Sequence, residues 1–126
     1  MPITSTTDTS RDITTLTATG KITLEEIIIV VKTFKDDPPA KNILWEFSEA
    51  YPGDPFGAMD MDRIAALATT NLNLREQPDG KTAFVAASDF IFGLARMYTT
   101  YLELQGPSHE IQVFRALDEA HEWLAE

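Results

Sequence analysis

Few residues of this chain are of the types that usually carry out catalysis or hold a metal ion. The 126 residues include no cysteine, and the only histidines are His109 and His121. Zinc sites need histidines or cysteines at short, regular spacings, and neither histidine has such company. Ser108 precedes His109, but adjacency along the chain does not provide the geometry in which a base activates a serine. The sequence therefore predicts no metal site and no nucleophilic catalysis.

The acidic pairs fit structural roles better than chemical ones. Asp60 and Asp62 have the spacing that begins a calcium loop, but the glycine and terminal glutamate of such a loop do not follow. We expect these aspartates to cap a helix, and Asp36 and Asp37 to lie in a solvated turn. No glycine-rich phosphate loop of the P-loop or dinucleotide type is present. We therefore expect no cofactor and no enzymatic activity.

A small-ligand site is the remaining chemical possibility. In an open parallel sheet, ligands collect at the carboxyl ends of the strands, where the amides of the following helices point outward. Aromatic bodies with a few polar groups suit such a site. The residues expected there are Trp45, Ser48, Tyr51, Phe56, Ser88, Phe92 and Arg96, with Arg115 as a further candidate. The alternative is that Trp45 and Phe92 are core residues and that Ser88 only caps a helix.

Arg96 has two competing interpretations of its own. It stands in an otherwise apolar helical stretch, where a charged side chain needs a reason. It either pairs with Glu103 or Glu46, or it is the cation that holds the anionic head group of a ligand.

Composition and charge exclude several classes of protein. Lysine and arginine number 10 against 20 aspartates and glutamates, so the net charge is −10, and such a surface repels nucleic acids and anionic membranes. The hydrophobic share of 44% is enough for a folded core. The aliphatic run at 27–31 is far shorter than the ~20 residues of a membrane span. The start of the chain lacks the pattern of a secretory signal, so we expect a cytoplasmic protein.

The first third of the chain predicts a hairpin followed by a helix. Threonine-rich residues 3–7 and 13–19 suit two strands with a polar turn between them, and Gly20 is expected to end the second strand. We expect residues 1–10 to be a poorly ordered terminus or an edge strand, and residues 11–126 to form the domain. Thr23 and Glu26 have the spacing of a capping box, in which hydroxyl and carboxylate each satisfy an amide of the first turn.

The segment after this cap favours a helix over a strand. Leu24, Ile27, Ile28, Val31 and Phe34 recur at helical spacing. Residues 27–31 alone have the composition of a buried strand, which is the competing interpretation. The two prolines after Asp37 are expected to end the helix.

The rest of the chain alternates strands with helices. Residues 42–47, 82–87 and 110–114 are apolar runs between chain breakers, as buried strands are. An irregular loop is expected at 48–57, then a helix from Asp60 or Asp62 to Leu72. Ser88 is expected to cap a long apolar helix, and Asp118 to cap a last one. The alternation predicts a single α/β domain, with a mixed, mostly parallel sheet of four or five strands covered by about four helices.

The long helix at 88–104 is apolar on almost every side. Phe92, Met97 and Tyr101 lie off its main buried face. A helix of this kind either lies deep in the core or forms a subunit interface, such as that of a C2 dimer.

Five stretches carry a likeness to a known family. They are residues 19–26 (TGKITLEE), 43–47 (ILWEF), 83–89 (AFVAASD), 92–98 (FGLARMY) and the ending VFR at 113–115 with Ala120, Trp123 and Leu124. Together they resemble the bacterial STAS-like family related to the sporulation anti-sigma-factor antagonist, the SpoIIAA-like proteins. The resemblance implies a STAS-like mixed sheet covered by helices, in agreement with the pattern of elements.

The resemblance also bears on function. Antagonists of this family switch partners when a serine at a helix start, after the central strand, is phosphorylated. The equivalent stretch at 57–62 reads GAMDMD and contains no serine. We therefore expect a non-catalytic STAS-like regulatory or protein-interaction module without that serine, acting on a protein partner or as a homodimer. The alternative is a carrier or sensor of a small apolar or anionic lipid-like ligand, held near the 48–58 loop and the 88–104 helix.

Overall fold

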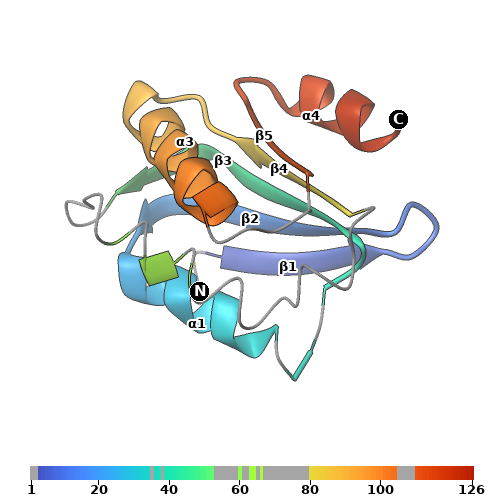
Figure 1. Cartoon of the computed structure of the whole chain (residues 1–126), viewed down its shortest axis with the longest axis horizontal. Coiled ribbons are helices and arrows are strands. Elements are labelled where there is room, and N and C mark those ends of the chain that lie inside the picture. The colour runs from blue at the N-terminus through green and yellow to red at the C-terminus, as the bar shows by residue number, and fades with distance from the viewer. Residues whose placement is uncertain are drawn as a thin grey trace.

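A five-stranded sheet forms the centre of the molecule. The computed structural model describes residues 3–34, 36–37, 39–52, 60, 63–64, 66, 80–104 and 110–126. Along these residues the elements are β1 (Ile3–Asp8), β2 (Ile13–Ile22), α1 (Leu24–Thr33), β3 (Asn42–Pro52), β4 (Lys81–Val85), α3 (Asp89–Leu104), β5 (Glu110–Phe114) and α4 (Leu117–Leu124). Figure 1 shows the helices around the sheet.

The strands lie in the order in which they occur along the chain. β1 pairs with β2 in antiparallel fashion, whereas β2, β3, β4 and β5 run parallel to one another. The predicted hairpin and the predicted mixed, mostly parallel sheet are therefore confirmed. Parallel neighbours need a crossover on one face of the sheet, and helices α1 and α3 provide two of these crossovers.

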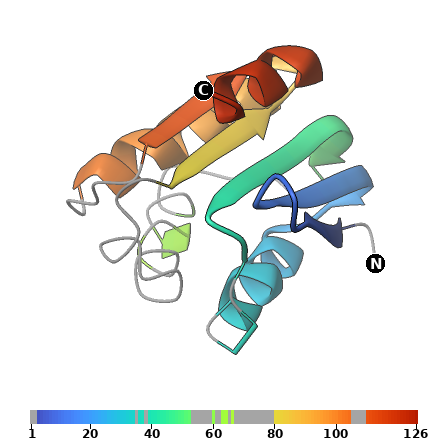
Figure 2. The same cartoon turned by 90° about the vertical axis from the view of Figure 1, so that its right-hand side faces the viewer.

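Two apolar layers cover the sheet, one on each face. Trp45, Phe47 and Phe84 point to the face covered by α1 and α3, whereas Leu44 and Val85 point to the face covered by α4. Figure 2 shows α4 on the side of the sheet opposite α1. Because successive residues of a strand point to opposite faces, a strand buried on both sides is apolar throughout. This is why the apolar runs in β3 and β4 predicted buried strands correctly.

Strands β2 and β3 continue beyond their predicted ends. Gly20 was expected to end β2, and residues 48–52 were expected in a loop. Both expectations are wrong, because residues 19–22 of β2 pair in parallel with residues 49–52 of β3 after an irregularity between Thr17 and Thr19. Gly20 accommodates the extension with a φ of 72°, which residues with a side chain rarely adopt. Partner strands thus override the local breaking signals of glycine and proline.

Helix α1 confirms half of the predicted capping box. The amide of Glu26 donates to Thr23 Oγ1 at 3.3 Å, as expected of an N-cap threonine. The carboxylate half is wrong, because Glu26 Oε2 is buried and has no hydrogen-bond partner. Residues 27–31 are helical, so the strand interpretation of this segment is excluded, and the helix ends before Asp36 as predicted.

The carboxyl-terminal elements differ from prediction in two details. β4 ends at Val85 and not at residue 87. Asp118 does not cap α4, since the helix begins at Leu117 after Ala116, whose side chain makes no capping hydrogen bond. Asp118 lies within the first turn, where a carboxylate still interacts favourably with the helix dipole.

The predicted helix from Asp60 or Asp62 to Leu72 lies mostly outside the described residues. Asp60, Arg63, Ile64 and Ala66 are helical. Within the part of the chain that is described, no helix has the length and apolar character needed to cross a bilayer.

Candidate functional site

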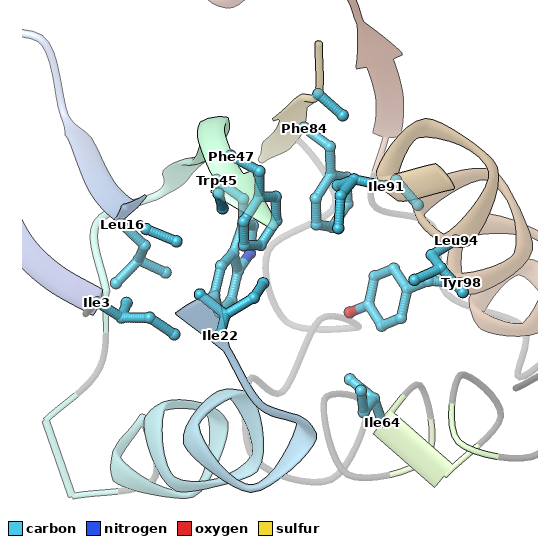
Figure 3. Close-up of a cluster of buried hydrophobic side chains, with 14 of the residues drawn as sticks. Ile3, Leu16, Ile22, Trp45, Phe47, Ile64, Phe84, Ile91, Leu94 and Tyr98 are labelled. Atoms are coloured by element: carbon cyan, nitrogen blue, oxygen red, sulfur yellow. The ribbon is translucent and has the colours of Figure 1, made fainter. Parts of the chain in front are cut away.

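An apolar cavity lies between the sheet and the helices α1 and α3. Its volume is about 60 Å³. Its wall consists of Ile22, Ile27, Val31, Trp45, Phe47, Ile64, Phe84, Ile91, Leu94, Ala95 and Tyr98. Figure 3 shows most of these side chains converging from the strands, from α3 and from Ile64. The cavity therefore joins residues far apart in the sequence, which the fold brings to one face of the sheet.

Aromatic rings form the sheet side of this cavity. The Trp45 ring stacks on Phe47 at a centroid distance of 5.8 Å and on Phe84 at 6.3 Å. Phe34 and Tyr98 approach this row edge-on, Phe34 against Trp45 at 6.3 Å and Tyr98 against Phe84 at 5.3 Å. Each such pair contributes about 0.5–1.5 kcal/mol beyond the area it buries. The row makes this wall rigid, because moving one ring disturbs its neighbours.

Tyr98 brings a hydroxyl group to this wall. The hydroxyl points from α3 toward the side of the cavity where Ile22 and Trp45 lie (Figure 3). Burial raises the pKa of Tyr98 well above the ordinary value of a phenol. The phenol therefore stays neutral, and it offers one hydroxyl in otherwise apolar surroundings.

The structure does not gather the seven predicted site residues into one pocket. Of the six that lie among the described residues, Trp45 is the one in the cavity wall. Ser48, Ser88 and Arg96 are exposed, and Tyr51 is 57% exposed at the end of β3. Phe56 lies outside the described residues. The ligand role of these residues stays a prediction.

Two of those residues have structural roles. The amide of Ile91 donates to Ser88 Oγ at 3.2 Å, so Ser88 caps α3. Phe92 lies beneath the guanidinium of Arg115, whose central carbon is 4.0 Å from the ring centroid. Arg115 also donates to the carbonyl of Ala87 at 3.1 Å and pairs with Asp89 at 2.8 Å. Arg115 thus connects the carboxyl ends of β4 and β5, and its guanidinium is already paired with protein groups.

Arg96 has no ion-pair partner among the residues that the structure describes. The carboxylate of Glu46 accepts a hydrogen bond from the Ser48 amide at 2.8 Å instead. The predicted pair of Arg96 with Glu46 or Glu103 is therefore not formed within the described part of the chain.

Sequence patterns did not identify most of the cavity wall. Phe47, Phe84, Leu94 and Tyr98 were recognised only as apolar members of strands and a helix. Apolar spacing shows which face of an element is buried, but it does not show where two buried faces leave a gap. The gap depends on how the crossing helices are spaced above the sheet.

Of the two histidines, His121 lies among the described residues. No group of three or more potential ligands occurs in the parts of the chain that are described. At the surface, Arg11 Nη2 donates to His121 Nδ1 across 3.2 Å.

A second candidate site is an apolar flank of α3. Phe90 and Leu104 are 48% and 76% exposed, although both are large and apolar. Met97 and Tyr101, which are partly buried, lie at helical spacing between them on the same flank. We refer to Phe90, Met97, Tyr101 and Leu104 as the α3 flank. Phe92, grouped with Met97 and Tyr101 in the sequence analysis, lies on the other side of the helix beneath Arg115.

Comparisons with known proteins identify the fold. No protein-family model matches the sequence, and no curated protein is significantly similar to it. Among solved structures, the chain is similar to an uncharacterised DUF3478-family protein with a SpoIIAA-like fold from Shewanella loihica PV-4. The two are 15% identical, with a TM-score of 0.57 over 97% of this chain and 91% of that one.

The second similar structure is the unphosphorylated form of the anti-sigma factor antagonist SpoIIAA. It is 15% identical, with a TM-score of 0.55 over 97% of this chain and 96% of that one. The fold of this chain is therefore SpoIIAA-like, as the resemblance in the sequence implied.

Proposed function

We propose that this chain, which has a SpoIIAA-like fold, is a non-catalytic regulatory or protein-interaction module. The observation that carries the proposal is the α3 flank. Large apolar side chains that gather on one exposed surface are typical of sites that contact another protein. The fold supports the same conclusion, because a similar structure is that of an anti-sigma factor antagonist.

The proposed module works without the serine switch of the antagonists it resembles. The stretch at 57–62 has no serine in the position that the resemblance assigns to one. Partner exchange would therefore depend on concentration and affinity, and not on phosphorylation at that helix start.

Affinity capture with a matched pair of variants tests this function. Phe90→Glu together with Leu104→Glu places two carboxylates on the α3 flank. Thr9→Glu together with Thr19→Glu adds the same charge at two exposed positions outside α3. We expect quantitative mass spectrometry to show a partner that is retained by the wild type and the Thr9/Thr19 variant and lost by the Phe90/Leu104 variant. Equal recovery by all three well-folded proteins would refute the α3 flank as the binding surface.

A second candidate function is binding of a small apolar ligand in the cavity. Apart from the Tyr98 hydroxyl and the Trp45 indole N–H, the side chains of the wall are apolar. The cavity also lies against α3, the helix near which the sequence predicted a ligand. Its volume of about 60 Å³ is less than half the ~150 Å³ of a protein cavity that binds benzene. A ligand of a few carbon atoms fits this volume, whereas a lipid chain would need the walls to move apart.

Two measurements test this candidate. Native mass spectrometry of the purified protein should show an adduct that disappears on denaturation. In addition, Trp123→Phe leaves Trp45 as the only indole, and its fluorescence should respond saturably to xenon, an apolar probe smaller than benzene that enters dry protein cavities. Ala95→Ile fills part of the cavity and should abolish the response. Gly93→Ala on the same helix should not, because a methyl group there meets no atom within 4 Å. A response that survives Ala95→Ile would exclude the cavity as the site.

A further inference from the structure

A groove lies between the first strand of the sheet and helix α1. Its volume is about 210 Å³, more than three times that of the apolar cavity. Ile3, Ser5 and Thr7 of β1 form one side, and Ile29 and Val30 of α1 form the other. Ile29 is 46% exposed, so this side of α1 is not covered by the sheet. The groove therefore has an apolar floor and a rim of small hydroxyl side chains.

The strand beside this groove has a free edge. β1 is the first strand in the order of the sheet, and of the described strands it pairs with β2 alone. Figure 2 shows it at the border of the sheet, with α1 beneath it. In an antiparallel pair, alternate residues direct their N–H and C=O groups away from the partner. Half of the six residues of β1 thus present both groups to a further strand.

The edge lacks the features that usually prevent strand addition. Natural edge strands are protected by lysine or proline, by bulges, or by inward-pointing charges. β1 has the sequence ITSTTD, in which only the last residue is charged, and its pairing with β2 is regular over all six positions. Threonine and isoleucine also favour extended backbone. The strand is therefore an open template for an extended segment.

Charge decides which segment suits this edge. Asp37 is the charged residue among those that line the groove, and Asp36 next to it is exposed. In a homodimer, two chains that each carry a net charge of −10 would have to associate. Opposite charges steer association and like charges disfavour it. A basic partner is favoured over self-association.

We propose that the β1 edge and its groove take up an extended, basic segment of a partner protein as an additional strand. The added strand lies about 4.8 Å from β1 and hydrogen-bonds to its free backbone groups. Alternate side chains of the segment enter the groove and pack on Ile29 and Val30. A lysine or arginine at one end meets Asp37. The proposal rests on the function as an interaction module and names a second surface of that module.

Selection from a random peptide display library tests the proposal on the full chain. We expect enriched peptides to alternate β-branched residues with polar ones and to carry lysine or arginine. Their binding should weaken as salt is raised, since it includes ion pairing. No enrichment, or enrichment without basic residues, would overturn the proposal.

Two variants of β1 locate the binding. Ser5→Lys places a cation in the groove, whereas Thr6→Lys adds the same charge on the opposite face of the same strand. Ser5→Lys should weaken a selected peptide at least about tenfold, and Thr6→Lys should have a much smaller effect. Asp37→Asn should weaken it by roughly two- to fivefold. Equal effects of the two lysine variants would place the peptide elsewhere.

Two further measurements distinguish a basic partner from a second copy of this chain, and the β1 edge from the α3 flank. Sedimentation of the wild type and of Ser5→Lys shows whether β1 pairs with a second copy, and a dimer that Ser5→Lys dissociates would overturn the choice of a basic partner. The Phe90/Leu104 variant should bind the selected peptides as the wild type does. Loss of peptide binding in that variant alone would refute the β1 edge and leave the α3 flank standing.

Discussion

Replacing Tyr98 by phenylalanine should change how the stability of this protein depends on pH. Tyr98 is buried against Phe84 and lines the apolar cavity, and burial raises its pKa. In the unfolded chain the same phenol ionises near its ordinary pKa of about 10. Above that pH the folded state holds one more proton than the unfolded state, so unfolding becomes more favourable as the pH rises.

The magnitude follows from this difference of one proton. The stabilisation by the neutral phenol is fully present below about pH 9 and declines above about pH 10. Between about pH 9 and pH 11 the wild type should lose about 1.4 kcal/mol of unfolding free energy through Tyr98 alone. Tyr98→Phe should lack this component, whatever the loss of the hydroxyl does to its stability at neutral pH.

Urea denaturation of the wild type and the variant at these two pH values measures the difference. Other titrating groups are present in both proteins and cancel in the comparison. Tyr51→Phe is the control, because Tyr51 is 57% exposed and its surroundings change little on unfolding. If Tyr98→Phe lost as much stability between the two pH values as the wild type, the phenol would not be desolvated in the fold. The description of the cavity wall would then be wrong.

Four further predictions concern stability. Lys81 Nζ donates to the carbonyls of Trp123 and Glu126 at 3.0 Å each and lies 5.2 Å from the Trp123 ring centroid. Lys81→Met should therefore lower the free energy of unfolding by about 1–2 kcal/mol and speed amide hydrogen exchange in α4. Unchanged exchange in α4 would show that Lys81 does not hold this helix on the sheet. Thr23→Ala should cost about 1 kcal/mol in urea denaturation. Glu26→Met keeps the length of the side chain but removes both carboxylate oxygens. It should cost no more than about 0.5 kcal/mol, because Glu26 Oε2 has no hydrogen-bond partner to lose. A cost equal to that of Thr23→Ala would show that the carboxylate does complete the capping box. Leu16→Ala should lower the free energy of unfolding by about 2–5 kcal/mol, because Leu16 is only 1% exposed and its removal leaves a cavity. The thermal midpoint should fall accordingly.

Local signals predicted well where the nearest neighbours along the chain decide the structure. The hydroxyl of Thr23 and the apolar spacing after it predicted α1 against the strand propensity of residues 27–31. The polar turn between β1 and β2 forms as expected, with Asp8 accepting from the Ser10 hydroxyl at 2.7 Å. That hydroxyl lowers the pKa of the exposed Asp8 carboxyl. These features depend on atoms within a few residues of one another.

Predictions failed where a distant partner decides the structure. Gly20 suggested the end of a strand, and residues 48–52 suggested a loop, but residues 19–22 and 49–52 form a parallel pair whose strands come from either side of α1. The carboxylate of Glu26 was expected to complete the cap, but tertiary packing buries one of its oxygens without a partner. Chain breakers act locally by about 1–3 kcal/mol, and several cross-strand hydrogen bonds together can exceed that amount.

The sequence alone determined the class of fold and the order of its elements. Alternating apolar runs and capped helical stretches are sufficient for this, because side-chain period and chain breakers are properties of the local backbone. It did not determine the candidate sites. The cavity arises where α1, α3 and Ile64 meet one face of the sheet, and the groove arises because α1 does not cover the space beside β1. Both are gaps between elements, so their existence depends on the spacing and angle of packed layers, which only the tertiary structure decides.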